Sequence, residues 1–125
     1  MAKILVVDDE PAILRLVSGF LSRAGHEVIT CTGPIAVMDA CRRESFDVLL
    51  SDVRMPGMDG HELARWVAIN YPATRTVLMS GLDLQCQACP YSPRCSLVNK
   101  PFGYSRIVAA IERALGQPAN SAECR

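Results

Sequence analysis

The chain lacks both an excess of one charge and any long apolar run. Its 125 residues carry 13 Lys and Arg against 13 Asp and Glu, so the formal net charge at pH 7 is zero. Nucleic-acid-binding domains need a basic surface, which this balance does not indicate. The apolar runs have the length of strands, far below the ~20 residues that cross a bilayer. We therefore expect neither nucleic acid nor a membrane as a partner.

Three sequence signals are also missing at the N-terminus. The opening stretch MAKILVVDDE lacks the apolar core and the cleavage site of a signal peptide, so we expect a cytoplasmic protein. No G-x-G-x-x-G follows the first apolar run, which argues against a dinucleotide site. The acidic run that does follow it, Asp8–Asp9–Glu10, is not the D-x-D of haloacid-dehalogenase-type phosphatases.

Lysine is scarce as well. The chain has eleven Arg but only two Lys residues, Lys3 and Lys100. Lys3 opens the first apolar run, where we expect it to be an ordinary exposed residue. Lys100 lies late in the chain in the sequence NKPF, and its use in place of Arg requires a separate reason.

What the chain does contain is an alternation of short apolar runs and longer amphipathic segments. With 50% hydrophobic and 21% charged residues, it has the composition of one globular domain, expected over residues 1–116, with a flexible polar tail over 117–125. The alternation predicts a parallel sheet with helices on both faces. We expect strands at 4–7, 28–31, 48–52, 76–80 and 97–98, and helices at 10–24, 34–43, 60–70 and 103–115.

Polar residues follow the expected strands at the points where these strands end. Asp8 and Asp9 follow the first strand, and Asp52 ends the third. Ser80 and Lys100 stand at the ends of the last two. In a parallel α/β sheet, ligands bind at this edge, so we expect the five groups to converge. Asp9 has an alternative role as the N-cap of the first helix.

Clustered carboxylates repel one another unless a counter-charge is present. Carboxylate oxygens suit Mg²⁺, which favours partners that bear phosphate. A Lys adds a point charge that reaches a phosphoryl oxygen, and a Ser hydroxyl can donate to another. Together these residues would supply what phosphoryl transfer requires. They include a carboxylate nucleophile, ligands for a metal ion, a positive charge that contacts the phosphoryl group and a hydroxyl donor.

In four motifs, the sequence resembles the receiver domain of bacterial two-component response regulators. The resemblance covers residue 3 to about residue 115, and its motifs are VVDDEP (6–11), DVLLSDVRMPGMDG (47–60), VLMSG (77–81) and NKPF (99–102). It implies a doubly wound, flavodoxin-like α/β fold with five parallel strands in the order 2-1-3-4-5. It also implies a phosphorelay signalling protein, phosphorylated by a sensor histidine kinase or a histidine phosphotransfer protein, and not an enzyme with a separate substrate.

The resemblance assigns roles to the same residues. Asp52 is implied to be the phosphoacceptor, with Lys100 and Ser80 in contact with the phosphoryl group. Asp8, Asp9, Asp52 and the backbone carbonyl of Arg54 are implied to hold Mg²⁺. A compact ammonium suits this crowded place better than a guanidinium, which accounts for Lys100.

The sequence departs from the family pattern in two places. The family often has an aromatic residue three positions before the Lys, where this chain has Leu97. The stretch CQACPYSPRC, residues 86–95, falls where the family has its fourth helix, and prolines there cost ~3 kcal/mol inside a helix. We expect that helix to be short, over 82–88, or replaced by a loop rich in Cys and Pro.

Cys86, Cys89 and Cys95 leave three interpretations open. Their spacing suits a soft metal site for Zn²⁺ or an Fe–S cluster, for which Cys124 or Asp83 would be a fourth ligand. They could form a disulfide or redox switch, or remain ordinary reduced thiols. The sequence thus carries two functional hypotheses, a phosphoacceptor receiver and a metal or redox sensor on a receiver scaffold. It names neither the kinase nor the downstream protein.

Overall fold

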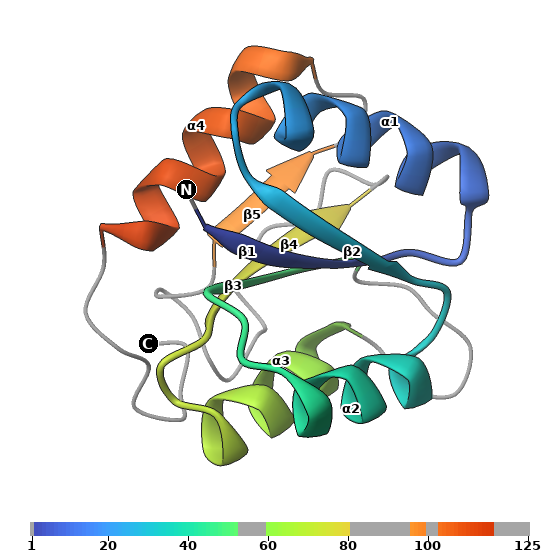
Figure 1. Ribbon diagram of the computed structural model, residues 1–125, viewed down its shortest axis with the longest axis vertical. Helices are drawn as coiled ribbons and strands as arrows, with labels where there is room; N and C mark the ends of the chain where they lie inside the picture. Colours follow the sequence, from blue (N-terminus) through green and yellow to red (C-terminus); the bar gives the residue numbers. More distant parts are fainter. Residues whose placement is uncertain (1, 53–59, 81–95, 100–102, 117–125) are drawn as a thin grey trace.

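The computed structural model describes residues 2–52, 60–80, 96–99 and 103–116. Their strands form one five-stranded sheet in the order β2-β1-β3-β4-β5, with every neighbouring pair parallel (Figure 1). The strands are β1 (Lys3–Val7), β2 (Glu27–Cys31), β3 (Val48–Asp52), β4 (Arg75–Ser80) and β5 (Ser96–Asn99). The helices are α1 (Pro11–Arg23), α2 (Pro34–Arg43), α3 (Gly60–Asn70) and α4 (Tyr104–Leu115).

The helices cover both faces of the sheet. Helices α1 and α4 lie on one face, and α2 and α3 on the other (Figure 1). Each face has its own apolar core. The α1/α4 core contains Ile4, Val6, Leu50 and Met79, while the α2/α3 core contains Leu5, Val7 and Leu49. This arrangement confirms the predicted flavodoxin-like class, an α/β protein with a parallel sheet between two helical layers.

The strand sequences explain this layering. All five residues of β3 are buried, because neighbouring side chains point to opposite faces and both faces are covered. Continuous apolar runs, instead of alternating ones, are therefore what such strands require. At the end of α1, Gly25 adopts a φ of 94°, a left-handed conformation that favours glycine and ends the helix.

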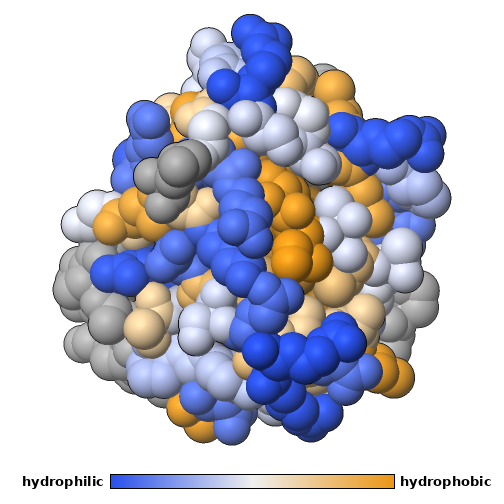
Figure 2. Space-filling view, viewed as in Figure 1, coloured by the Kyte–Doolittle hydropathy of each residue, from blue (hydrophilic) through white to orange (hydrophobic). Residues whose placement is uncertain are grey.

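Two expectations about chain segments lie outside the described residues, namely the short helix over 82–88 and the tail over 117–125. Among the helices that the structure describes, none has the length and apolar character to span a bilayer. On the face shown in Figure 2, hydrophilic side chains separate the hydrophobic ones. The exposed large apolar side chains of the described residues are Leu16, Ile35 and Ile69, which lie on three different helices. Single residues of this kind are normal on a protein surface.

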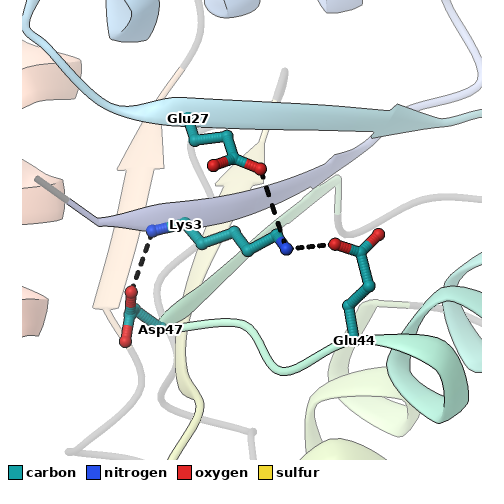
Figure 3. A network of polar contacts seen from close by, with 4 residues as sticks. All are labelled: Lys3, Glu27, Glu44 and Asp47. Carbon is teal, nitrogen blue, oxygen red and sulfur yellow. Dashed lines mark hydrogen bonds and ion pairs between the residues drawn. The ribbon is translucent and has the colours of Figure 1, made fainter.

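Lys3 is bound more extensively than the sequence predicted. Its backbone N–H donates to Asp47 Oδ2 at 2.8 Å, and its ammonium pairs with Glu44 and lies 3.7 Å from Glu27 Oε2 (Figure 3). The hydrogen bond to Glu44 is the largest cause that raises the pKa of Lys3. The prediction of an ordinary exposed residue was therefore wrong. Acidic residues of β2 and of the single connection between α2 and β3, both distant from Lys3 in the sequence, meet at this Lys.

Replacing Asp47 tests how much this junction stabilises the fold. Asp47→Ala removes the acceptor of the Lys3 N–H at the start of a central strand, and we expect it to lower the free energy of unfolding by about 1 kcal/mol. Asp39→Ala is the matched control, since it breaks an exposed pair with Arg42 one helical turn away and should cost less than about 0.5 kcal/mol. Urea denaturation measures both, and equal costs would contradict a special role for Asp47.

Cys31 and Cys41 lie in the α2/α3 core. Their side chains are nearly covered, with 8% and 6% of their surface exposed. Burial raises the pKa of the Cys31 thiol and raises the pKa of Cys41 to about 11. Since the thiolate is the reactive form, both thiols should be inert at neutral pH.

Alkylation of the folded protein checks this expectation. Because burial raises the pKa of both thiols, that of Cys41 to about 11, they are mostly protonated at pH 8, and we expect iodoacetamide to label Cys41 and Cys31 only after unfolding. Because folding raises the Cys41 pKa, its contribution to stability is complete below the ordinary thiol value of 9.0 and is lost as the pH rises to about 11. Peptide mass mapping assigns the labels, and rapid labelling of Cys41 in the native protein would contradict this expectation.

Candidate phosphoryl-transfer site

Asp8 directly follows β1, and hydrogen bonds fix both its backbone and its side chain. Val7 is in register with Cys31, and the Asp8 N–H extends this pairing by donating to the Cys31 carbonyl oxygen at 3.3 Å. The Asp8 side chain is fully buried, and its Oδ1 accepts the Glu10 N–H at 2.9 Å. The backbone of the β1–α1 turn thus orients one buried carboxylate at this edge of the sheet.

Asp52 lies at the equivalent place on the neighbouring strand. Val7 is in register with Ser51, so Asp8 and Asp52 follow as the next pair of positions. Strand alternation places both on the face of Val6 and Leu50, which belong to the α1/α4 core. Asp52 is only 6% exposed. Neighbouring strands lie about 4.8 Å apart, so the backbones of these two buried residues are adjacent. Asp52 is not among the three acidic residues whose ligand oxygens lie within 4.8 Å of one another.

Asp8 also belongs to a group of three acidic residues, of which the other two are exposed to solvent. One ligand oxygen each of Asp8, Asp9 and Glu10 lies within 4.8 Å of the others, and Asp9 and Glu10 are exposed. The N-cap of α1 is Glu10, so Asp9 does not have the capping role considered as an alternative. The sequence did not predict that Glu10 belongs to this group of acidic residues. The only signal for it was the unbroken acidic run Asp8–Asp9–Glu10 after an apolar strand.

This donor set fits a hard divalent cation. All of its side-chain ligands are carboxylates, and oxygen ligands of this kind are those that Mg²⁺ takes in proteins. Carboxylates that are buried together also need a positive charge nearby, because their mutual repulsion is not screened by water. The residues present therefore match the chemistry of a magnesium site.

The structure describes only some of the other predicted site residues. Ser80 ends β4, and its backbone is in register with Asn99, the last residue of β5 and the residue before Lys100 in the sequence. Lys100, Arg54 and the three cysteines Cys86, Cys89 and Cys95 lie outside the described residues. Within the described ranges, Asp8–Asp9–Glu10 is the one group of three or more potential metal ligands, so nothing there supports a Zn²⁺ or Fe–S site.

Comparisons with known proteins identify the family of the chain. The family model described as the response regulator receiver domain matches residues 4–112. The chain belongs to this family. As a receiver domain, it is a module of two-component signal transduction.

Several relatives illustrate the relationship. The response regulator protein FleR of Pseudomonas aeruginosa is 35% identical over an alignment of 126 positions, which covers 98% of this chain and 26% of FleR. The transcriptional regulator NtrC of Escherichia coli is 34% identical over 112 positions, covering 88% of this chain and 24% of NtrC. The chain thus spans about a quarter of the length of these curated relatives.

Solved structures show the same fold. The chemotaxis response regulator CheY4 of Vibrio cholerae has a TM-score of 0.83 and 29% identity, and the match covers 92% of this chain and 99% of CheY4. A BeF3-activated receiver domain, DrrB, has a TM-score of 0.81 and 28% identity, with 94% and 99% covered.

Neutralising Asp8 tests whether the two buried carboxylates repel each other. Asp8→Asn keeps an oxygen that can accept the Glu10 N–H but removes the charge, so we expect it to raise the free energy of unfolding of the metal-free protein by about 1 kcal/mol. Denaturation in the presence of a chelator measures this change. Asp39→Asn, on the exposed face of α2, is the control and should change stability little. A destabilised Asp8→Asn protein would show that the native contacts of the Asp8 carboxylate outweigh its repulsion from Asp52.

Proposed function

We propose that the chain is a phosphoacceptor in two-component signalling and that Asp52 receives the phosphoryl group. The observation that carries the proposal is the burial of Asp52 beside Asp8 at the carboxyl edge of the sheet. A carboxylate in this place has a nucleophilic oxygen in a largely water-excluded site, next to a donor set suited to Mg²⁺. The membership of the receiver family supports the same role.

The transfer is a displacement at phosphorus. A carboxylate oxygen of Asp52 attacks the phosphorus of a phosphohistidine, forming a P–O bond as the P–N bond breaks, and the imidazole leaves with the electron pair and takes up a proton. Water later hydrolyses the acyl phosphate and restores the carboxylate. The protein supplies position and electrostatics, and it converts no separate substrate.

The surrounding residues have supporting roles in this proposal. Asp8, Asp9, Asp52 and the Arg54 carbonyl would hold Mg²⁺, which when bound supplies positive charge that offsets the charge of the phosphoryl oxygens. Asp8 is oriented for this by its hydrogen bond from the Glu10 N–H. Lys100 would contact a phosphoryl oxygen, and the Ser80 hydroxyl would donate to another.

The partners follow from the chemistry and from the relatives. The phosphohistidine donor would be a sensor histidine kinase or a histidine phosphotransfer protein. The sensor protein GacS of Pseudomonas syringae is 47% identical to this chain over 60 residues, 48% of the chain and 7% of GacS. The output would be binding to a further protein, selected by a surface that changes when Asp52 is phosphorylated.

Replacing single aspartates with asparagine tests the proposal. With acetyl phosphate and Mg²⁺, we expect the wild-type protein to gain one phosphoryl group in intact mass spectra, and Asp52→Asn to gain none, because an amide oxygen is a poor nucleophile. Removal of Mg²⁺ with a chelator should also abolish the gain. Asp39→Asn is the matched control and should be phosphorylated like the wild type. Equal phosphorylation of Asp52→Asn and wild type would refute the assignment.

A further inference from the structure

Ser51 directly precedes the proposed phosphoacceptor and is fully buried. The three residues before it in β3, Val48–Leu50, are all apolar. Its neighbours in register are Val7 on β1 and Leu78 on β4, whose side chains have no hydrogen-bonding groups. A hydroxyl in such surroundings costs free energy unless it has a partner. An alanine would fill the same place without that cost.

The partner of this hydroxyl is the backbone of Asp52. Ser51 Oγ donates to the Asp52 carbonyl oxygen at 2.9 Å, in a buried hydrogen bond between adjacent residues. Side chains alternate along a strand, so Ser51 lies on the α2/α3 face with Leu49, opposite the face that Asp52 shares with Asp8. Ser51 therefore acts on Asp52 from behind the site, without contact with a bound phosphoryl group.

Because Ser51 fixes the Asp52 carbonyl group, it also restricts the orientation of the reactive Asp52 carboxylate. The carbonyl carbon and Cβ of Asp52 are bonded to the same Cα, so a fixed carbonyl restricts the ψ angle of Asp52 and the rotation of its Cα at the end of the strand. The direction of the Cα–Cβ bond determines where the carboxylate oxygens lie. In-line attack depends on this direction, and misplacement by about 1 Å can cost a hundredfold in rate.

We propose that Ser51 is a positioning residue for Asp52, in that its hydroxyl fixes the last peptide of β3 so that the Asp52 carboxylate meets the phosphorus in line. This inference rests on the proposed function, since it concerns the same carboxylate. It predicts an effect on the rate of phosphoryl transfer that exceeds any effect on the binding of the donor.

The chain contains a matched control for a buried hydroxyl of this kind. Thr74 Oγ1 donates to the Phe46 carbonyl oxygen at 2.7 Å and is also buried, with 5% exposed. Thr74 and Phe46 precede β4 and β3, so this bond lies at the amino-terminal edge of the sheet, away from Asp52. Thr74→Val removes the same type of hydrogen bond without affecting the phosphoacceptor.

The test measures phosphorylation by acetyl phosphate, at saturating Mg²⁺, as a function of donor concentration. We expect Ser51→Ala to lower the maximal rate about five- to tenfold, the effect of one lost hydrogen bond, with the half-saturating donor concentration changed less than about twofold. Ser51→Thr retains the hydroxyl and should restore the rate. Ser51→Cys keeps a side chain of similar size with a weaker donor and should fall between serine and alanine.

The control separates a positioning role from general stabilisation. Ser51→Ala and Thr74→Val should both lower the urea midpoint, whereas only Ser51→Ala should slow phosphorylation. Equal maximal rates for these two variants, with similar midpoints, would overturn the inference and leave the proposed function intact. If the wild type acquires no phosphoryl group while it is folded and binds Mg²⁺, the proposed function fails and the inference fails with it.

Discussion

The repulsion between carboxylates that the fold buries together is the constraint on which the site depends. Asp8 directly follows β1 and Asp52 ends the neighbouring strand β3, and both are withdrawn from water. Two such charges raise the free energy of the folded state unless a cation is near. The rest of the sheet must therefore be stable enough to hold them, and the two continuous apolar cores provide this stability.

Acidic residues gather at both edges of the sheet. At the amino-terminal edge, the Lys3 ammonium pairs with Glu44 and Glu27, while the backbone N–H of Lys3 donates to the Asp47 carboxylate. At the carboxyl edge, Asp8, Asp9 and Glu10 lie together and form a donor set that suits a divalent cation. The first edge joins strands and stabilises the fold. The second has the carboxylate donors that Mg²⁺ would need in the proposed function.

Much of this architecture could be predicted from the sequence. Continuous apolar runs such as Ile4–Val7, which alternate with amphipathic segments, indicated a parallel sheet covered on both faces, and the acids at the strand ends indicated the functional edge. The interactions of Lys3 could not be predicted, because its acidic neighbours come from β2 and from the connection between α2 and β3, which only the folded chain brings to Lys3. The hydrogen bond from Ser51 to Asp52 was missed for a related reason, since a serine in a strand has no local pattern that reveals its partner.

The position of the phosphoryl group tests the central claim most directly. An acyl phosphate on aspartate is reduced by borohydride to homoserine, which peptide mass spectrometry assigns to a single residue. After phosphorylation in the presence of Mg²⁺, the account predicts homoserine at position 52 and at no other acidic residue. Homoserine at Asp8 or Asp9, the corresponding alcohol 2-amino-5-hydroxypentanoic acid at Glu10, or an unmodified Asp52 in a protein that has taken up phosphate, would contradict it.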